Sequence, residues 1–274
     1  SAASLIGTLQ AAYTNFHYLR DVWRRTTEKD ALLGIGMTGI GSGKVQKLDL
    51  EQAAKLAVST NKYYAAELGI NSAARVTTVK PSGTTSCVLG TSSGIHAWHN
   101  DFYIRRIRVG KNEAIYNYLA INHPELVEDD FFKADTQAII SIPQRAPEHG
   151  ILRHETSIEL LNRVKDIYER WIAPGHTSGN NTHNVSCTVS VKEEEWDEVG
   201  KWMWENREFY NGLSVLPYYG GTHKQMPFED TDEQTFNELF NNLTEVDLSG
   251  VVEVIDNTNL TGELACAGGS CEIT

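Results

Sequence analysis

Apolar side chains recur every three or four residues in several stretches of the chain, which is the spacing of an amphipathic helix. Asp49 can cap one of these helices and Gly69 can end it. Thr156 and Glu159 form a capping box in front of another. The spacing predicts helices over residues 2–28, 49–68, 111–121, 156–172, 192–211 and 233–243.

Short β-branched and apolar runs lie between these helices and predict buried strands. They cover residues 74–79, 137–142 (where Pro143 is expected to stop the strand) and 183–191. Strands that alternate with helices indicate an α/β fold with parallel strands. No pattern is sustained after Leu243, so we expect one folded domain over residues 1–243 and a mobile acidic tail over residues 244–274.

Charge supports that division. The 274 residues carry a net charge of −12, and residues 225–274 hold eleven Asp or Glu and no Lys or Arg. A block of one sign favours an exposed tail. Without a basic patch, a nucleic-acid polymer is not an expected partner. No stretch resembles a signal peptide or a membrane span, and four cysteines are too few for a disulfide scaffold, so we expect a reducing cytoplasm and no membrane association.

Two glycine-rich segments are candidates for chemistry. Gly34 to Gly39 matches G-x-G-x-x-G, but charged residues precede it instead of a strand. The Gly43-Lys44 pair lacks the Ser or Thr that a Walker A loop needs next, since Val45 follows. Close backbone packing is therefore the better interpretation of this segment, and no metal site is expected.

The second segment follows the predicted strand 74–79 directly. Ligands of α/β proteins gather where such strands end, and glycine lets the backbone approach an anion. Hydroxyls and free N–H groups there could surround a phosphate, although an ordinary Ser/Thr turn remains the alternative. The residues of this candidate phosphate loop are Pro81, Ser82, Gly83, Thr84, Thr85 and Ser86.

Taken in order, several motifs resemble the large chains of ribonucleotide reductases. The resemblance is nearest to class II, the adenosylcobalamin-dependent reductases, and among them to the monomeric triphosphate enzymes. Tyr218-Tyr219 is the one feature that suggests class I, which stays an alternative. The motifs are Ile35-Gly36-Met37-Thr38-Gly39, Val79-Lys80-Pro81-Ser82-Gly83-Thr84, Ser93-Gly94-Ile95-His96, Tyr103-Ile104-Arg105-Arg106, Asn181-Thr182-His183-Asn184-Val185-Ser186, Leu216-Pro217-Tyr218, Gly220-Gly221-Thr222 and Cys266-Ala267-Gly268-Gly269-Ser270-Cys271.

The resemblance implies the C-terminal half of a ten-stranded α/β barrel. It implies adenosylcobalamin as the cofactor and ribonucleotides, expected as triphosphates, as the substrates. In this family a thiyl radical forms on a cysteine within an Asn-x-Cys-x-Glu motif. That motif is absent here, since Cys187 has the wrong neighbours. We therefore expect the radical cysteine on an upstream half of the enzyme, and the chain to be inactive without it.

The resemblance also gives Cys266 and Cys271 a role. Their glycine-containing spacer lets the two sulfurs meet, and a zinc site would want further ligands that the tail lacks. In the family, such a pair re-reduces the active-site disulfide and is itself reduced by a thioredoxin-like partner. Two other hypotheses stay open: a nucleotide- or cobalamin-binding module without its own activity, and an α/β domain whose tail donates thiols.

Overall fold

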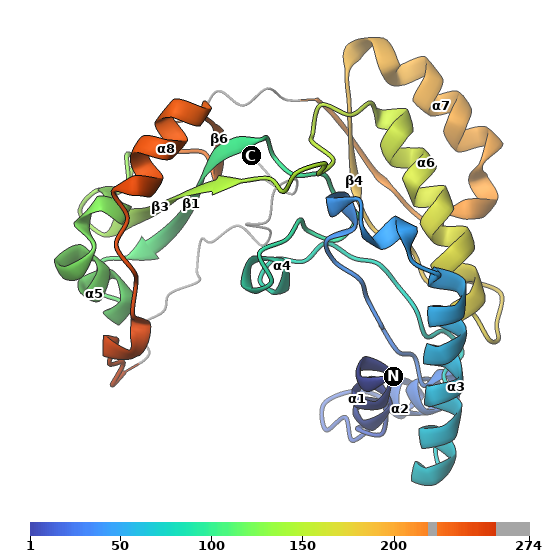
Figure 1. Ribbon diagram of the computed structural model, residues 1–274. Coiled ribbons are helices and arrows are strands. Elements are labelled where there is room, and N and C mark those ends of the chain that lie inside the picture. Colours follow the sequence, from blue (N-terminus) through green and yellow to red (C-terminus); the bar gives the residue numbers. More distant parts are fainter. Residues whose placement is uncertain (219–223, 256–274) are drawn as a thin grey trace. The chain divides into compact units, whose positions relative to one another are not determined.

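The computed structural model describes residues 1–218 and 224–255. The chain divides into two compact units, which are described separately below. Unit 1 comprises residues 1–97 and 149–218, and unit 2 comprises residues 98–148 together with the chain from residue 219 onward. Figure 1 shows the helices and strands of both.

Unit 1 is built on short parallel segments. Ile35 pairs with Thr77, Val79 pairs with Val185, and strand β4 pairs with β5, all in parallel. The parallel α/β arrangement expected from the sequence is therefore present in this unit. The segment at 74–79 is extended and mostly buried as predicted, although it pairs through single bridges. The elements are α1 (Ala2–Ala11), α2 (Asp21–Asp30), α3 (Leu50–Leu68), α4 (Thr85–Val88), α6 (Ser157–Ile167), β4 (Thr188–Val191), α7 (Trp196–Glu205) and β5 (Ser214–Pro217).

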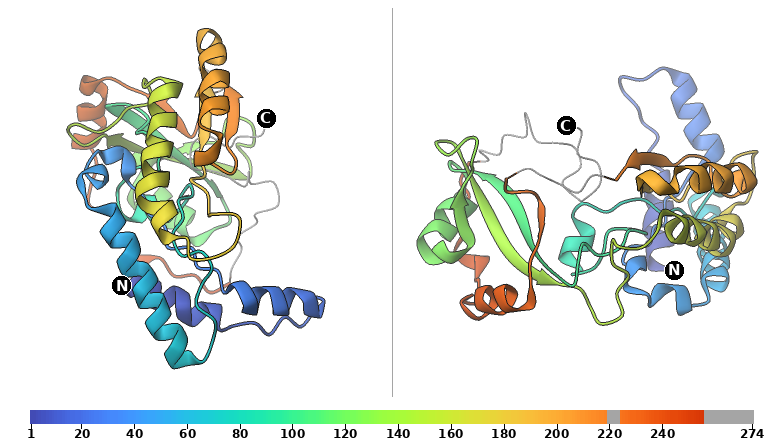
Figure 2. Two further views of the ribbon diagram at one scale, coloured as in Figure 1. Left: turned by 90° about the vertical axis from the view of Figure 1, so that its right-hand side faces the viewer. Right: turned by 90° about the horizontal axis from the view of Figure 1, so that it is seen from above.

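The core of unit 1 forms where α6, a π-helical turn at Tyr168–Ile172 and α7 pack on the parallel segments. Figure 2 shows α6 and α7 beside β4 and β5. Val79, Leu161, Ile167 and Val189 are fully buried in this cluster. Burial on both faces explains why these strands are apolar without alternation.

Helix boundaries confirm the capping signals. Asp49 accepts a hydrogen bond from the Gln52 N–H, and Gly69 closes α3 with a left-handed φ of 67°. Thr156 and Glu159 form the expected capping box of α6. These ends depend on local side-chain chemistry, which the sequence displays directly.

The single helix predicted over residues 2–28 is wrong. Helices α1 and α2 are separate, and the side chains that α1 buries are Ser4 and Thr8 instead of its leucines. The Ser4 hydroxyl donates to the Ala57 carbonyl at 2.7 Å, and the Asn61 amide donates to Thr8 at 3.0 Å. Polar contacts with α3 thus position α1, which an apolar periodicity cannot reveal.

Unit 2 contains an antiparallel sheet that the sequence analysis did not predict. Its strand order is β2-β3-β1-β6. The strand expected to stop at Pro143 continues to Arg145, because β2 pairs only with residues 138–140 and leaves that edge open near the proline. The elements are β1 (Phe102–Gly110), α5 (Ala114–Asn122), β2 (Val127–Asp129), β3 (Gln137–Arg145), β6 (Phe228–Asp230) and α8 (Glu233–Asn241).

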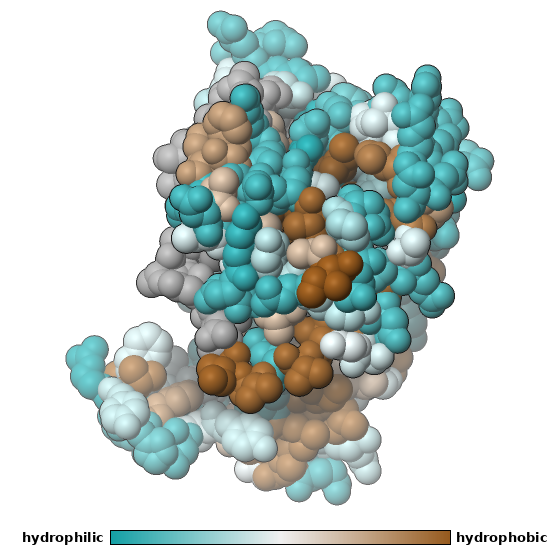
Figure 3. All heavy atoms as spheres, turned by 90° about the vertical axis from the view of Figure 1, so that its left-hand side faces the viewer, coloured by the Kyte–Doolittle hydropathy of each residue, from teal (hydrophilic) through white to brown (hydrophobic). Residues whose placement is uncertain are grey.

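The two faces of this sheet differ. Helix α5 covers one face, where Leu119 packs with Val109, Ala138 and Ile140. Helix α8 contacts β1 and β3, and its Phe236 ring lies 5.2 Å from Phe102. Figure 3, which looks onto the side of Figure 1 that carries α5 and α8, shows brown hydrophobic patches among hydrophilic side chains.

Candidate functional site

The candidate phosphate loop lies at the carboxyl end of a buried parallel segment in unit 1. The Val79 N–H donates to the Asn184 carbonyl at 3.2 Å, and the Ser186 N–H donates to the Val79 carbonyl at 2.8 Å. Val79 is itself fully buried. The loop therefore starts from a fixed strand end, the position at which α/β proteins hold ligands.

Serine side chains hold the loop in shape. The Ser82 hydroxyl accepts the Ser86 N–H at 2.8 Å, and the Ser86 hydroxyl donates to the Ser82 carbonyl at 2.8 Å. The Ser93 hydroxyl accepts the Ser82 N–H at 2.8 Å and donates to the Ser82 carbonyl at 2.9 Å. The sequence had assigned the hydroxyls of Ser82 and Ser86 to the ligand, whereas here they form internal bonds.

The outer part of the loop keeps its donors unused. Within the described residues, the N–H groups of Gly83, Thr84 and Thr85 form no hydrogen bond, and neither do the two threonine hydroxyls. All three residues are exposed. Three adjacent N–H donors and two hydroxyls can bind the oxygens of a phosphate.

Gly83 leaves space where such a ligand would approach. A Cβ at this position would meet no atom within 4 Å, and its backbone is not in the left-handed region. A larger side chain there would consequently be compatible with the fold and would still occupy the volume over the donors.

His96 ties the loop region to β4, a contact that the sequence analysis did not foresee. The Thr188 N–H donates to His96 Nε2 at 3.1 Å, so Nδ1 carries the ring proton and donates to the Ser93 carbonyl at 3.1 Å. Burial lowers the pKa of His96 below its usual value, and the positive charge of Arg163 adds to this effect. A neutral His96 thus holds Ser93, which in turn holds Ser82.

The glycine-rich segment at 34–41 packs against the same region, as the sequence analysis favoured. A Cβ on Gly39, whose φ is 76°, would lie 2.3 Å from Thr91 Oγ1, and one on Gly41 would lie 2.4 Å from the His96 carbonyl oxygen. These glycines permit close backbone approach and show no phosphate-binding geometry of their own.

The cysteines differ in accessibility. Cys87 is exposed on α4, and its thiol donates to the Gly83 carbonyl at 3.0 Å. Cys187 is buried, and burial raises the pKa of its thiol to about 12, which makes it inert. The predicted pair Cys266 and Cys271 lies outside the described residues, as does Gly220-Gly221-Thr222.

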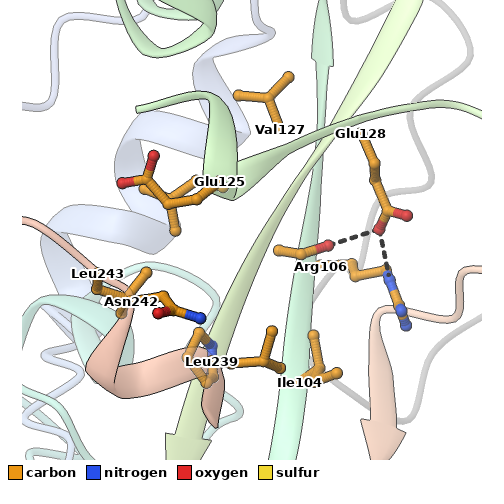
Figure 4. A pocket seen from close by; sticks show the side chains of 11 residues that line it. Ile104, Arg106, Glu125, Val127, Glu128, Leu239, Asn242 and Leu243 are labelled. Atoms are coloured by element: carbon orange, nitrogen blue, oxygen red, sulfur yellow. Dashed lines mark hydrogen bonds and ion pairs between the residues drawn. The ribbon is translucent and has the colours of Figure 1, made fainter. Parts of the chain in front are cut away.

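Unit 2 contains a separate pocket of about 300 Å³ between the sheet and α8. Figure 4 shows Arg106 and Ser141 directed at Glu128, with donor–acceptor distances of 2.9 and 2.6 Å. Arg106 also pairs with Glu229. Since these groups satisfy one another and the remaining lining is largely apolar, the pocket offers no unpaired charge to a ligand.

The fit of a corrinoid cofactor can be tested against these features. The two main pockets of the described chain measure about 300 and 510 Å³, at the small end for drug-sized ligands, which adenosylcobalamin exceeds in size. Among residues 1–218 and 224–255, no group of His, Cys, Asp and Glu could hold a metal ion, and no helix is long and apolar enough to cross a bilayer. The described residues do not form a cobalamin site.

Comparison with known proteins first defines the class. The fold is similar to that of a crystal structure of a B12-dependent (class II) ribonucleotide reductase, with a TM-score of 0.71, 22% identity and coverage of 87% of this chain and 37% of the other. At this identity the likeness concerns the fold alone. No family model matches the sequence.

Curated relatives then narrow the likeness. The chain is 26% identical over 295 residues to the adenosylcobalamin-dependent ribonucleoside-triphosphate reductase of Lactobacillus acidophilus, which covers 94% of this chain and 38% of the relative. It is 30% identical over 233 residues to a probable enzyme of that name from Dictyostelium discoideum, with 80% and 28% covered. The chain thus spans less than half of the length of these relatives. The similarity to class II triphosphate reductases, inferred from the motifs, is confirmed.

Proposed function

We propose that this chain is the part of an adenosylcobalamin-dependent ribonucleoside-triphosphate reductase that holds the substrate phosphates and carries the re-reducing cysteine pair. Relatives of that name match 94% and 99% of the chain. In this proposal unit 1 supplies part of a ten-stranded barrel. The carrying observation is the loop at the strand end, whose donors at Gly83, Thr84 and Thr85 have no partner in the described chain.

The proposed division of roles follows from the loop geometry. Hydrogen bonds from N–H groups to a charged phosphate are stronger than those between neutral groups. Backbone N–H groups of residues 83–85 and the hydroxyls of Thr84 and Thr85 would contact the phosphates. Ser82, Ser86 and Ser93 would hold the loop, and Lys80, exposed just before it, adds a positive charge nearby.

Ribose reduction requires groups that this sequence lacks. The cofactor would supply the radical when bound, and the cysteine that receives it would belong to an upstream part of the enzyme, since the sequence contains no Asn-x-Cys-x-Glu motif. Each reduction of a ribose 2′-carbon oxidises two active-site thiols to a disulfide. Cys266 and Cys271 would reduce that disulfide by thiol–disulfide exchange and become a disulfide themselves. A thioredoxin-like dithiol would then restore them.

Gly83→Val tests the phosphate loop. The branched side chain would project into open space above the donors, so the Michaelis constant for the nucleotide should rise by about tenfold or more in enzyme reconstituted with its upstream part. Gly212→Val is the matched control, because that glycine also has no atom within 4 Å of its Cβ position and no positive φ. It precedes β5, away from the carboxyl end of the sheet. An unchanged constant in folded Gly83→Val protein contradicts the loop assignment.

Mixing experiments test whether the chain is one part of an enzyme. The isolated chain, given adenosylcobalamin, a ribonucleoside triphosphate and a dithiol, should form no deoxynucleotide, whereas adding the upstream part should restore activity. Product from the chain alone would contradict the proposal and would turn attention to Cys87. A chain that binds nucleotide but never gains activity would favour the binding-module hypothesis.

Replacing Cys266 and Cys271 together by Ser tests the recycling role. In pre-reduced, reconstituted enzyme the first turnover should be intact, while sustained turnover with thioredoxin should stop. A small dithiol should partly restore it, since it reaches the active-site disulfide directly. Loss of the first turnover would assign the pair to the chemical step instead.

A further inference from the structure

Arg75 stands at the start of the buried segment that leads to the phosphate loop, and its charge is unbalanced. The side chain is partly buried, and its Nε atom is inaccessible to water and has no hydrogen-bond partner. Within residues 1–218 and 224–255, no carboxylate forms an ion pair with Arg75. A partly buried guanidinium without a counter-ion is costly, so such groups normally have a partner.

Two histidines flank this arginine. The backbone of Arg75 pairs with that of His176, and His176 Nε2 donates to the Gly179 carbonyl at 3.0 Å. His176 Nδ1 is buried and has no partner among the described residues. His183 contacts the Thr77 carbonyl through Nδ1 at 3.1 Å. Burial lowers the pKa of His183, and the positive charges of Arg75 and His176 lower it further. These three side chains therefore share one electropositive environment.

The loop between the histidines closes over the arginine. A Cβ on Gly179, whose φ is 93°, would lie 3.7 Å from the Arg75 guanidinium, so the glycine brings backbone close to it. The neighbouring residues of this loop, Ser178, Asn180 and Asn181, are polar and exposed. The surroundings thus supply further hydrogen-bonding groups beside the charge.

We propose that Arg75, His176 and His183 form a binding site for an oxyanion, distinct from the phosphate loop. The guanidinium fork matches the oxygens of a carboxylate or phosphate, and the imidazoles lie beside it. Arg75 begins the segment and Pro81 follows its end, so the two sites are roughly 20 Å apart along an extended chain. The anion has two possible sources: a free phosphate-bearing ligand, or a carboxylate side chain from sequence that the longer relatives have and this chain does not span.

Imidazole NMR resonances of the full chain would report occupancy. Inorganic phosphate, titrated at constant ionic strength with sodium chloride, should shift the His176 and His183 resonances saturably if the ligand is free. Arg75→Gln should weaken this binding by about tenfold or more. Arg25→Gln is the matched control, because it removes the same charge from exposed helix α2 of the same unit.

A second arm distinguishes the other source. In the chain combined with its upstream part, a protein carboxylate would shift the same two resonances without added phosphate, and phosphate would then have no effect. Arg75→Gln would remove that shift as well. If neither arm gives a shift that depends on Arg75, the cluster binds no oxyanion and the inference is wrong. Gly83→Val should leave these signals unchanged, so this test stands apart from that of the phosphate loop.

Discussion

Unit 1 and unit 2 both combine a sheet with helices, yet they place polar side chains differently. In unit 1 the parallel segments are covered on both faces, so Val79, Val185 and Val189 are buried and polar groups are left to the ends of the strands. In unit 2 the strands are antiparallel, and one face carries charges along their length, as in the contacts of Arg106 with Glu128 and Glu229.

This difference teaches where each unit can bind a ligand. Covered strands leave only their ends accessible, and both candidate anion sites, at residues 83–85 and around Arg75, lie at such ends. The charged face of unit 2 has its arginine already paired with carboxylates. Unpaired donors therefore gather in unit 1, whereas the charges of unit 2 mainly satisfy one another.

Truncating the core of unit 1 should break the comparison most severely. Leu161 is fully buried among the helices and parallel segments. Leu161→Ala should lower the free energy of unfolding by about 4 kcal/mol, because it leaves a cavity that the packed neighbours cannot fill. Urea denaturation would measure this. Ile107→Ala, at a side chain that is 43% exposed on β1, is the control and should cost far less.

Removing a buried charge should come next. Arg163 pairs with Glu155 through two bonds of 2.7 Å, and their side chains are only 5% and 12% exposed. Arg163→Met should cost about 3 kcal/mol of unfolding free energy, since Glu155 would stay buried without its partner. Protonating or replacing Glu155, as in the double variant with Glu155→Gln, should recover much of the loss. A single variant as stable as the parent would show that the pair is hydrated.

His96 should show a smaller effect that depends on pH. His96→Leu leaves the Thr188 N–H and the Ser93 carbonyl without a partner, which should cost about 1 to 2 kcal/mol. His96→Gln can both donate and accept, so it should retain much of the stability and the nucleotide Michaelis constant that His96→Leu loses.

The sign of the pH effect follows from the pKa. Burial lowers the pKa of folded His96, so the unfolded chain binds more protons as the pH falls below the ordinary histidine value of 6.5. Stability should therefore decrease as the pH drops through that range, and less steeply in His96→Gln. His183 shifts in the same direction and will leave part of the slope. Equal slopes for parent and His96→Gln would mean that His96 is not held neutral.

The smallest effect is expected in unit 2. Arg106→Met removes a cation whose partners, Glu128 and Glu229, are 40% and 48% exposed and can be solvated by water. The cost should be about 1 kcal/mol or less, in contrast to Arg163→Met. Unfolding curves of the two variants under one condition would test this. A loss as large as that of Arg163→Met would show that the charged face of unit 2 is as shielded as the core of unit 1.

The sequence by itself determined the local features. Asp49, Gly69, Thr156 and Glu159 mark helix ends because a cap needs only a side chain and a few neighbouring residues. The run at 74–79 is apolar because it is buried, and the loop after it contains the hydroxyls and the glycine that suggested phosphate binding. Motif order was sufficient to identify the similarity to class II reductases, now confirmed by relatives that match nearly all of the chain.

Tertiary structure decided which of those groups remain available and which strands pair. Ser82 and Ser86 are occupied because Ser93, eleven residues beyond Ser82, reaches back to the loop, and His96 fixes Ser93 through a bond to β4, about ninety residues away. The antiparallel sheet of unit 2 pairs Phe102 with Arg145 and Tyr103 with Asp230. Arg75 and His176 likewise meet only through the fold. Such pairings depend on long-range packing, which leaves no periodic signal in the sequence.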